Sequence, residues 1–337
     1  MRALLYFGGG ESAVRDVPDP VRKLGQILLK VMTSALCGSE MKGYLYGEAN
    51  FDKGWMTGHE MSGEVVDPGE SKYFKAGDRA VVQIMNGCGE CPYCKAGTYQ
   101  FCEKLEYENG VHAQYASMPE KCVVKAPNDI DFDMLALLGG DTVGVAYRAA
   151  KQLNLAPGKL VFVSGAGPIG LGVTSLLKYY GCEIVVSEPS EYRRHYAQQH
   201  AGAGLVLDPA REDVRARLRE MTGNTGPEIT VECSGNPTAQ LQALEYTRCG
   251  GTVMLCGENY NRFEIVPSVH IIHKELTVKG AFYFTAADFN EIVKLYHAGL
   301  DVSALASHRA ALSDAPPIIR AFSQGRTGKV LFHPQES

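Results

Sequence analysis

The chain lacks a long apolar run, a targeting segment and a repeat, and each absence narrows its class. No stretch of the 337 residues approaches about eighteen uninterrupted apolar residues, so we expect no membrane-spanning segment. The start, MRALLYFGGGES, has too short an apolar run for a secretory signal and no small-residue cleavage site, so we expect a cytosolic protein. No repeat or low-complexity tract is present, which argues against solenoid and disordered classes.

The chain also has no excess of basic over acidic residues. The formal net charge is −5, which argues against nucleic acid or an anionic membrane as the main partner. A hydrophobic content of 45% with 21% charged residues is typical of a soluble globular protein, and the length favours two domains. Ten cysteines in a chain without a secretory signal indicate metal or redox chemistry in a reducing compartment rather than a disulfide framework.

Four of these cysteines form a compact motif in the run CGECPYCKAGTYQFC: Cys88, Cys91, Cys94 and Cys102. Four thiolates so close in sequence can surround one zinc ion tetrahedrally, as in a closed structural site. The alternative is disulfides or inert core cysteines, but the interspersed Gly and Pro residues indicate a loop rather than a packed element. We therefore predict a structural zinc site.

The first third of the chain predicts a β domain, and the middle predicts a parallel sheet. Short β-branched runs bounded by turn residues cover 25–37, 61–70, 78–85 and 120–127. A helix is expected over 141–155, after which strands and helices alternate. The expected strands are 159–165, 183–189, 204–208, 228–235 and 251–257, and the expected helices are 168–181, 190–202, 213–223 and 238–250. This alternation predicts a doubly wound, mostly parallel sheet.

The final segment is too short to be a domain of its own. It contains expected helices at 286–299 and 315–325 and a last strand at 328–334, which needs a sheet to join. We expect it to fold back onto the first segment. The prediction is thus an α/β protein in which a β domain, residues 1–144 and 283–337, carries an inserted parallel-sheet domain, residues 145–282.

A glycine-rich turn joins an expected strand to an expected helix in the run VFVSGAGPIGLG. Gly165 allows the tight turn, Gly167 lets the backbone approach a pyrophosphate, and Gly170 lets helix and strand pack closely. Pro168 and Ile169 complete the loop, and the helix N-terminus would face the phosphates with its partial positive charge. A merely convenient glycine turn is the alternative, but the strand–turn–helix context favours a dinucleotide site.

Glu188 ends the next expected strand, eighteen residues past Gly170. A carboxylate there would accept hydrogen bonds from the adenosine ribose hydroxyls and repel a 2′-phosphate, which predicts NAD over NADP. Arg193 and Arg194 argue the other way, because either could pair with such a phosphate. The alternative for both arginines is a solvated helix face.

Cys37 in LCGSE and His59 in GHE are candidates for a second metal site. One thiolate and one imidazole are an incomplete set, because a catalytic zinc normally has three protein ligands and an open fourth position. On residue types alone, several acids could complete the set. Cys37 could instead be a buried hydrophobe, and His59 a core imidazole.

Together these motifs resemble the zinc-dependent medium-chain alcohol dehydrogenases over nearly the whole chain. The matching runs are CGSE, GHEMSGEVV, the four-cysteine lobe, GAGPIG, VECSGNP, KELTVKG and GKVLF. The resemblance implies a GroES-like β domain with both zinc sites and an inserted Rossmann domain. It leans toward the polyol, sorbitol, threonine and aminocyclitol dehydrogenases, because of CGSE, an acidic third ligand and SEPSEYRR.

The resemblance also implies roles around the catalytic zinc. The residues matching Cys37 and His59 bind the metal, and Asp141 is selected as the third ligand, with a helix N-cap as its alternative. Ser39 matches the hydroxyl that starts a proton relay, the alternative being a backbone cap. Glu60 matches a glutamate that approaches the metal without substrate. Because zinc with Cys37 and Asp141 is already neutral, we expect Glu60 to be at most a resting-state ligand.

Four further positions are matched less closely. Glu40 matches an aspartate that orients the ligand histidine. Lys42 falls where a relay-ending histidine is expected, which leaves water or Lys42 as the last acceptor. His112 falls where relatives often carry an aromatic residue that lines the pocket. It is expected either to contact a polar substrate or to have a plain packing or surface role. Lys329 matches a basic residue that contacts the cofactor pyrophosphate. The pocket is expected around Tyr44, Tyr46, Trp55 and His112.

The implied activity is oxidation of a secondary alcohol to a ketone, with hydride transfer to NAD and two zinc ions per chain. Polyols, sugars or aminocyclitols are the expected substrates, with simple secondary alcohols as the alternative. A zinc-free reductase would need neither Cys37 nor the four-cysteine lobe, and a non-catalytic scaffold is disfavoured because no catalytic group is missing. A homodimer or homotetramer is expected, with edge-to-edge pairing through 251–284.

Overall fold

The computed structural model describes residues 1–48 and 53–336, which divide into two compact units. Unit 1 comprises residues 1–141, 285–291 and 306–337, and unit 2 comprises 142–284 and 292–305. Within the described residues, no helix combines the length and apolar character needed to cross a membrane.

Unit 1 is built on a sheet in the order β10-β6-β5-β3-β18-β17, with β9 also paired to β3. Smaller sheets join β2-β1-β4 and β7-β8. The strands are β1 (Arg2–Gly8), β2 (Glu11–Asp16), β3 (Gln26–Leu36), β4 (Trp55–Met56), β5 (Glu60–Asp67), β6 (Arg79–Val82), β7 (Met85–Asn86), β8 (Glu106–Tyr107), β9 (Tyr115–Pro119), β10 (Val123–Lys125), β17 (Ala306–Ala311) and β18 (Lys329–His333). The helices are α1 (Glu40–Tyr46), α2 (Pro92–Lys95), α3 (Phe132–Leu138) and α10 (Ala315–Ser323).

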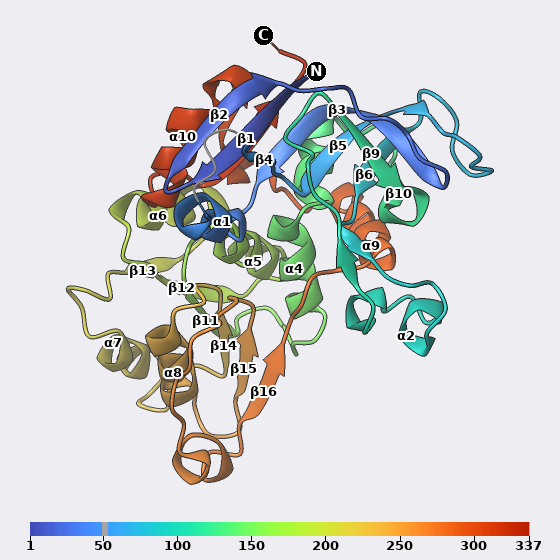
Figure 1. The fold of residues 1–337 in the computed structure, drawn as a ribbon. Helices are drawn as coiled ribbons and strands as arrows, with labels where there is room; N and C mark the ends of the chain where they lie inside the picture. Colours follow the sequence, from blue (N-terminus) through green and yellow to red (C-terminus); the bar gives the residue numbers. More distant parts are fainter. Residues whose placement is uncertain (49–52, 337) are drawn as a thin grey trace. The chain divides into compact units, whose positions relative to one another are not determined.

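The last strand ties the end of the chain to its beginning. β18 pairs antiparallel with β3, with Val330 opposite Leu36 and Phe332 opposite Ser34. Its side chains Val330 and Phe332 are fully buried, and they share a core cluster with Leu4 and Leu36. The predicted fold-back of the final strand is therefore correct (Figure 1).

Unit 2 is a parallel sheet in the order β13-β12-β11-β14-β15-β16. The strands are β11 (Leu160–Ser164), β12 (Glu183–Ser187), β13 (Leu205–Leu207), β14 (Ile229–Glu232), β15 (Thr252–Leu255) and β16 (Thr277–Gly280). The helices are α4 (Asp141–Ala150), α5 (Pro168–Tyr179), α6 (Glu191–Tyr196), α7 (Val214–Met221), α8 (Pro237–Tyr246) and α9 (Ala286–His297), and α4 and α9 each have residues in unit 1 as well. Figure 1 shows β11, β14, β15 and β16 side by side, and this sheet confirms the doubly wound class expected from the alternation of strands and helices.

One segment differs from the expected organisation. Residues 292–305 group with unit 2, whereas the sequence placed them in the β domain. The cause is local packing, because the short helix η5 (Ser303–Leu305) contacts α5 and the π-helix η3 (Ala197–Ala201). The Tyr196 hydroxyl also donates to the Ala304 carbonyl at 2.5 Å.

Candidate functional site

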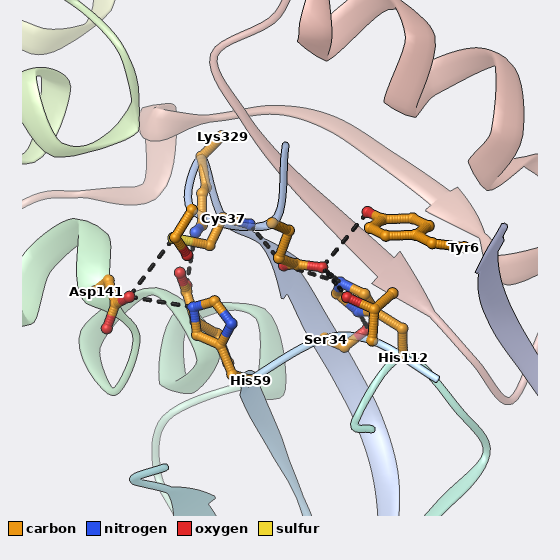
Figure 2. A network of polar contacts seen from close by, with 11 residues as sticks. Tyr6, Ser34, Cys37, His59, His112, Asp141 and Lys329 are labelled. Atoms are coloured by element: carbon orange, nitrogen blue, oxygen red, sulfur yellow. Dashed lines mark hydrogen bonds and ion pairs between the residues drawn. The ribbon is translucent and has the colours of Figure 1, made fainter. Parts of the chain in front are cut away.

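Three of the predicted ligands converge at the ends of paired strands in unit 1. Cys37 directly follows β3 and His59 directly precedes β5, and the pairing of Ala35 with Glu60 brings these strand ends together. Asp141 is the first residue of α4. His59 Nε2 lies 3.2 Å from Asp141 Oδ2, and Cys37 Sγ lies 3.5 Å from the same oxygen (Figure 2). All three side chains are buried.

This spacing fits a tetrahedral zinc ion. Zinc bonds of about 2.3 Å to sulfur and about 2.1 Å to nitrogen or oxygen give tetrahedral edges of about 3.4–3.6 Å. One ligand atom from each of Cys37, His59, Glu60 and Asp141 lies within 4.8 Å of the others. A thiolate, an imidazole and carboxylates are also the donors that zinc prefers.

Burial and neighbouring groups shift the pKa values of two of the donors. Burial raises the pKa of the Cys37 thiol. Burial alone would lower the pKa of His59, but the neighbouring Cys37 and Asp141 raise it well above its usual value.

Glu60 lies at the same site, but only one of its two carboxylate oxygens has a hydrogen-bond partner among the described residues. Its Oε2 accepts a hydrogen bond from Lys329 Nζ at 2.6 Å, and both side chains are buried. Its Oε1 is buried without a hydrogen-bond partner among the described residues, so a bound cation would satisfy this oxygen. The expected contact between Lys329 and the cofactor pyrophosphate stays a prediction, and in this structure the buried ammonium group pairs with Glu60.

Ser39 lies beside the Cys37 sulfur. Its hydroxyl donates to Cys37 Sγ at 3.3 Å, and the residue is exposed. Although Ser39 precedes α1, its side chain makes no capping hydrogen bond. The capping alternative is therefore wrong, and the hydroxyl connects the site with solvent.

Glu40 is the centre of a buried polar network that the sequence did not predict. Its carboxylate accepts hydrogen bonds from Cys37 N at 3.0 Å, Thr57 Oγ1 at 2.6 Å, Tyr6 Oη at 3.4 Å and His112 Nε2 at 3.3 Å. Burial alone would raise the pKa of Glu40, but His112, His59 and the Thr57 hydroxyl lower it to about 2. The network is drawn beside the ligand cluster in Figure 2.

This network corrects two expectations. Glu40 was expected to orient His59, but among the described residues its hydrogen bonds fix the backbone of Cys37 instead. His112 is fully buried and shares a 2.8 Å hydrogen bond with Ser34 Oγ, so the surface alternative is wrong and the side chain belongs to the buried network. No motif marks Tyr6, Thr57 or Ser34, and only their burial in the folded unit reveals them.

The aromatic residues expected around the pocket lie in different settings. Tyr44 is 2% exposed and packs against Tyr6, so it lies in the core of unit 1. Trp55 packs edge-on against the same tyrosine. Tyr46 is 82% exposed, and Lys42 also lies on the exposed side of α1.

The four-cysteine lobe forms a second candidate metal site. Its sulfur atoms lie within 4.8 Å of one another, and Cys88 Sγ is 3.9 Å from Cys94 Sγ, close to the edge of about 3.8 Å in a zinc–thiolate tetrahedron. The backbone N–H groups of Glu90 and Cys91 both donate to Cys88 Sγ at 3.4 Å and lower its pKa to about 6. All four are free thiols, so the disulfide alternative finds no support.

The glycine-rich loop has the form that the sequence predicted. Gly165 has a positive φ of 96°, which favours glycine. A side chain at Gly170 would lie 2.0 Å from the Gly165 carbonyl oxygen, so only glycine lets α5 start this close to β11. Gly167 caps α5, which begins with Pro168 and Ile169, and its Cβ position meets no atom closer than 3.9 Å. The N-terminus of α5 thus has room for a phosphate.

Glu188 directly follows β12 and turns toward this loop. Its carboxylate accepts hydrogen bonds from Ala166 N at 2.8 Å and Ser190 N at 2.9 Å. The acid that would hold the ribose is therefore already oriented by the loop that would hold the phosphates.

The two arginines of α6 differ in their contacts. Burial lowers the pKa of Arg193, although Glu188 beside it acts in the other direction, and Nη1 of Arg193 lies 3.9 Å from the Cβ position of Gly167. Arg194 donates to the Glu188 carbonyl at 2.7 Å and pairs with Asp208 at 3.0 Å. The solvated-face alternative is wrong for both side chains.

Comparison with known proteins is consistent with both candidate sites. The family described as "Alcohol dehydrogenase GroES-like domain" matches residues 23–128, and "Zinc-binding dehydrogenase" matches residues 168–298. An L-threonine 3-dehydrogenase of Pyrococcus furiosus is 32% identical over 96% of this chain and 95% of the relative.

Solved structures agree over the full length. Alcohol dehydrogenase TADH from Thermus sp. ATN1 superposes with a TM-score of 0.89 at 26% identity, covering 99% of each chain. The 2R,3R-butanediol dehydrogenase of Bacillus subtilis superposes with a TM-score of 0.84 at 27% identity, again over 99% of each chain.

Proposed function

Since the chain belongs to the zinc-dependent medium-chain alcohol dehydrogenase family, we propose that it oxidises a secondary alcohol to a ketone with NAD. The observation that carries the proposal is the tetrahedral spacing of Cys37, His59 and Asp141, three buried donors of the types zinc prefers. When bound, zinc would supply a Lewis acid that lowers the pKa of the substrate hydroxyl, and the nicotinamide would supply the hydride acceptor.

The chain's own proton carrier is Ser39. Its Oγ adjoins the Cys37 sulfur and is exposed, so it can accept the proton of the substrate hydroxyl and release its own to water. This route does not require Lys42 as the last proton acceptor.

Glu60 is a resting-state ligand at most, and Lys329 controls its effect. Zinc with Cys37, Asp141 and Glu60 would carry one negative charge, but the Lys329 ammonium 2.6 Å from Glu60 brings the set back to neutral. With zinc bound, Oε1 of Glu60 would be available to it while Oε2 keeps Lys329 as its partner. Because Lys329 neutralises its charge, the Glu60 carboxylate can lie near the zinc site without reducing the Lewis acidity that the reaction would need.

NAD is the proposed cofactor, with the GAGPIG loop at the pyrophosphate and Glu188 at the adenosine ribose. Replacing Glu188 by Gln should raise the KM for NAD about tenfold or more, as expected for loss of a charged hydrogen bond. The ratio of kcat/KM for the two cofactors tests the choice. A preference for NADP in the unmodified protein would overturn it.

The proposed substrate is a secondary alcohol whose neighbouring carbon carries an amino or hydroxyl group. Support comes from the relatives, a threonine 3-dehydrogenase and a butanediol dehydrogenase, whose named substrates share this arrangement. Polyols, sugars and aminocyclitols share it as well. NADH formation should be compared across these classes, L-threonine, 2,3-butanediol and 2-butanol. A higher kcat/KM for 2-butanol than for every substituted alcohol would favour the simple alcohol alternative.

Two zinc ions per chain are proposed, one at each site. Metal analysis distinguishes the proposed dehydrogenase, with two zinc ions per chain, from a non-catalytic scaffold. The scaffold would retain zinc only at the four-cysteine lobe and would form no NADH. Retention of two ions with no turnover on any alcohol would also overturn the enzyme assignment.

A homo-oligomer is proposed through the free edge of the unit 2 sheet. Among the described strands, β16 is at the edge and pairs with β15 alone, and its Val278 is 40% exposed. Val266, Val269 and Ile272 nearby in the chain are also exposed. Val278→Lys should therefore lower the mass measured by light scattering to that of one chain, and an unchanged mass would contradict this interface.

A further inference from the structure

Two cysteines of unit 2 lie at matching positions on neighbouring strands. β14 ends at Glu232 and β15 at Leu255, and these two residues are paired in register. Cys233 and Cys256 follow them directly, and the ladder continues because Cys256 N donates to the Glu232 carbonyl at 2.8 Å. Residues in register on adjacent parallel strands point to the same face of the sheet. The two thiols are therefore neighbours, because the strands that lead into them are paired in register.

Their separation suits a covalent link. Adjacent strands lie about 4.8 Å apart, which falls within the Cα separation of about 4.4–6.8 Å found in disulfides. The side chains already interact, since a hydrogen bond with Cys256, together with burial, raises the pKa of the Cys233 thiol. Both residues are partly exposed free thiols.

The pair adjoins the glycine-rich loop. Cys233 Cβ lies 3.5 Å from the Cβ position of Gly170, and the next residue, Ser234, lies 3.0 Å from that of Gly165. The loops after β14 and β15 leave no spare room, because a side chain at Gly257 would lie 2.1 Å from Gly235 N. A movement of either cysteine would therefore displace the glycine-rich loop that is expected to bind the nucleotide.

We propose that Cys233 and Cys256 form a redox modification site, which a hydroperoxide converts to a disulfide that weakens nucleotide binding. The second part rests on the proposed function. Peroxide oxidises the Cys256 thiol to a sulfenic acid and is itself reduced to water. The Cys233 thiol then attacks that sulfur, forming the S–S bond and releasing a second water. A dithiol reductant restores both thiols.

The disulfide acts by linking two loops that have no spare room. It ties the side chain of Cys233 to that of Cys256, and the residue after Cys233, Ser234, already lies against the Cβ position of Gly165. Reorienting the two side chains into disulfide geometry therefore shifts Ser234 against Gly165. The loop that receives the pyrophosphate is then no longer shaped for it.

The test uses the zinc-loaded protein and graded hydrogen peroxide, at doses below those that release zinc into a colorimetric chelator. Free thiols are blocked, the protein is digested without reduction, and cross-linked peptides are identified by mass spectrometry. NAD affinity is measured by calorimetry on the same samples. We expect a Cys233–Cys256 peptide, and a rise in the Kd for NAD of about tenfold that dithiothreitol reverses.

Variants separate this site from other thiols. Cys256→Ser should abolish both the cross-link and the peroxide effect on Kd. Cys182→Ser is the matched control in the same unit, since that thiol donates to the Ala156 carbonyl, and it should behave as the unmodified protein. Absence of the cross-link, or a cross-link that leaves the Kd unchanged, would overturn the proposal. A reduced protein that does not bind NAD would instead refute the proposed function, whereas the cross-link would still be detectable.

Discussion

Lys329 and Glu60 form an ion pair that is closed off from solvent. Nζ lies 2.6 Å from Oε2, and the two side chains are 0% and 1% exposed. The pair joins β18 to β5 next to the candidate zinc ligands. Its burial makes it sensitive to the loss of either partner, because a single buried charge has neither water nor a counter-ion.

Replacing Lys329 by Met should destabilise the protein by about 3–5 kcal/mol, the usual cost of leaving one charge of a buried pair uncompensated. Turnover should fall as well, because an unpaired Glu60 disturbs the candidate metal site that it shares with Cys37, His59 and Asp141. Urea denaturation and steady-state kinetics measure the two effects.

The double variant Glu60→Gln with Lys329→Met should regain most of the stability and part of the turnover, since no buried charge is left alone. Lys125→Met is the control, because its pair with Asp78 involves a lysine that is 55% exposed, and it should cost at most about 1 kcal/mol. If Lys329→Met and Lys125→Met lowered the free energy of unfolding equally, burial of the Lys329–Glu60 pair would not explain the loss.

His112→Phe tests whether the Glu40 network holds Cys37 in position. The change removes one donor from a buried carboxylate and should cost about 1–3 kcal/mol of stability. It should also loosen the metal at Cys37, seen as faster loss of one zinc to a chelator and an altered thiolate absorption band after cobalt substitution. The zinc of the four-cysteine lobe should leave at its usual rate. An unchanged cobalt spectrum would mean that His112 only fills space.

Parts of this site could be predicted because their residues are close in sequence or carry a motif. The lobe from Cys88 to Cys102 spans fifteen residues, and the glycine loop is one turn, so local geometry decides both. The pairing of Lys329 with Glu60 could not be predicted, because 269 positions separate them and only the joining of β18 to β3 brings them together. Burial likewise decides that His112 belongs to the network around Glu40 rather than to the surface.

Asp133 predicts how stability depends on pH. It accepts hydrogen bonds from Thr33 Oγ1 at 2.8 Å, His333 Nε2 at 2.7 Å and Arg309 Nε at 2.8 Å. Burial alone would raise its pKa, but these partners lower it. Its stabilisation is therefore complete above the unfolded-state pKa of about 3.9 and is lost as the pH falls through the lower folded-state pKa.

Asp133→Asn should thus lower the free energy of unfolding at pH 7 by about 1–3 kcal/mol. The difference from the unmodified protein should shrink as the pH falls below about 4. Urea titrations at pH 7, 4 and 3 measure it, with Asp19→Asn, at a site 76% exposed, as the surface control. A difference that stays constant with pH would contradict the role of the charge.

The two proposed zinc sites should respond differently to loss of a thiol. Cys91→Ser should lower the melting temperature by about 10 °C or more, because a structural zinc contributes directly to folding. Cys37→Ser should abolish turnover and leave the melting temperature within a few degrees. Each variant should retain one zinc by metal analysis. A stable, active Cys91→Ser protein would refute the structural role.

Anomalous scattering from a crystal at the zinc absorption edge tests the central claim most directly. We predict a peak about 2.3 Å from Cys37 Sγ and about 2.1 Å from both His59 Nε2 and an Asp141 oxygen, and a second peak among the four lobe sulfurs. A map without the first peak, or with that ion held by Glu60 while Asp141 turns away, would contradict the account.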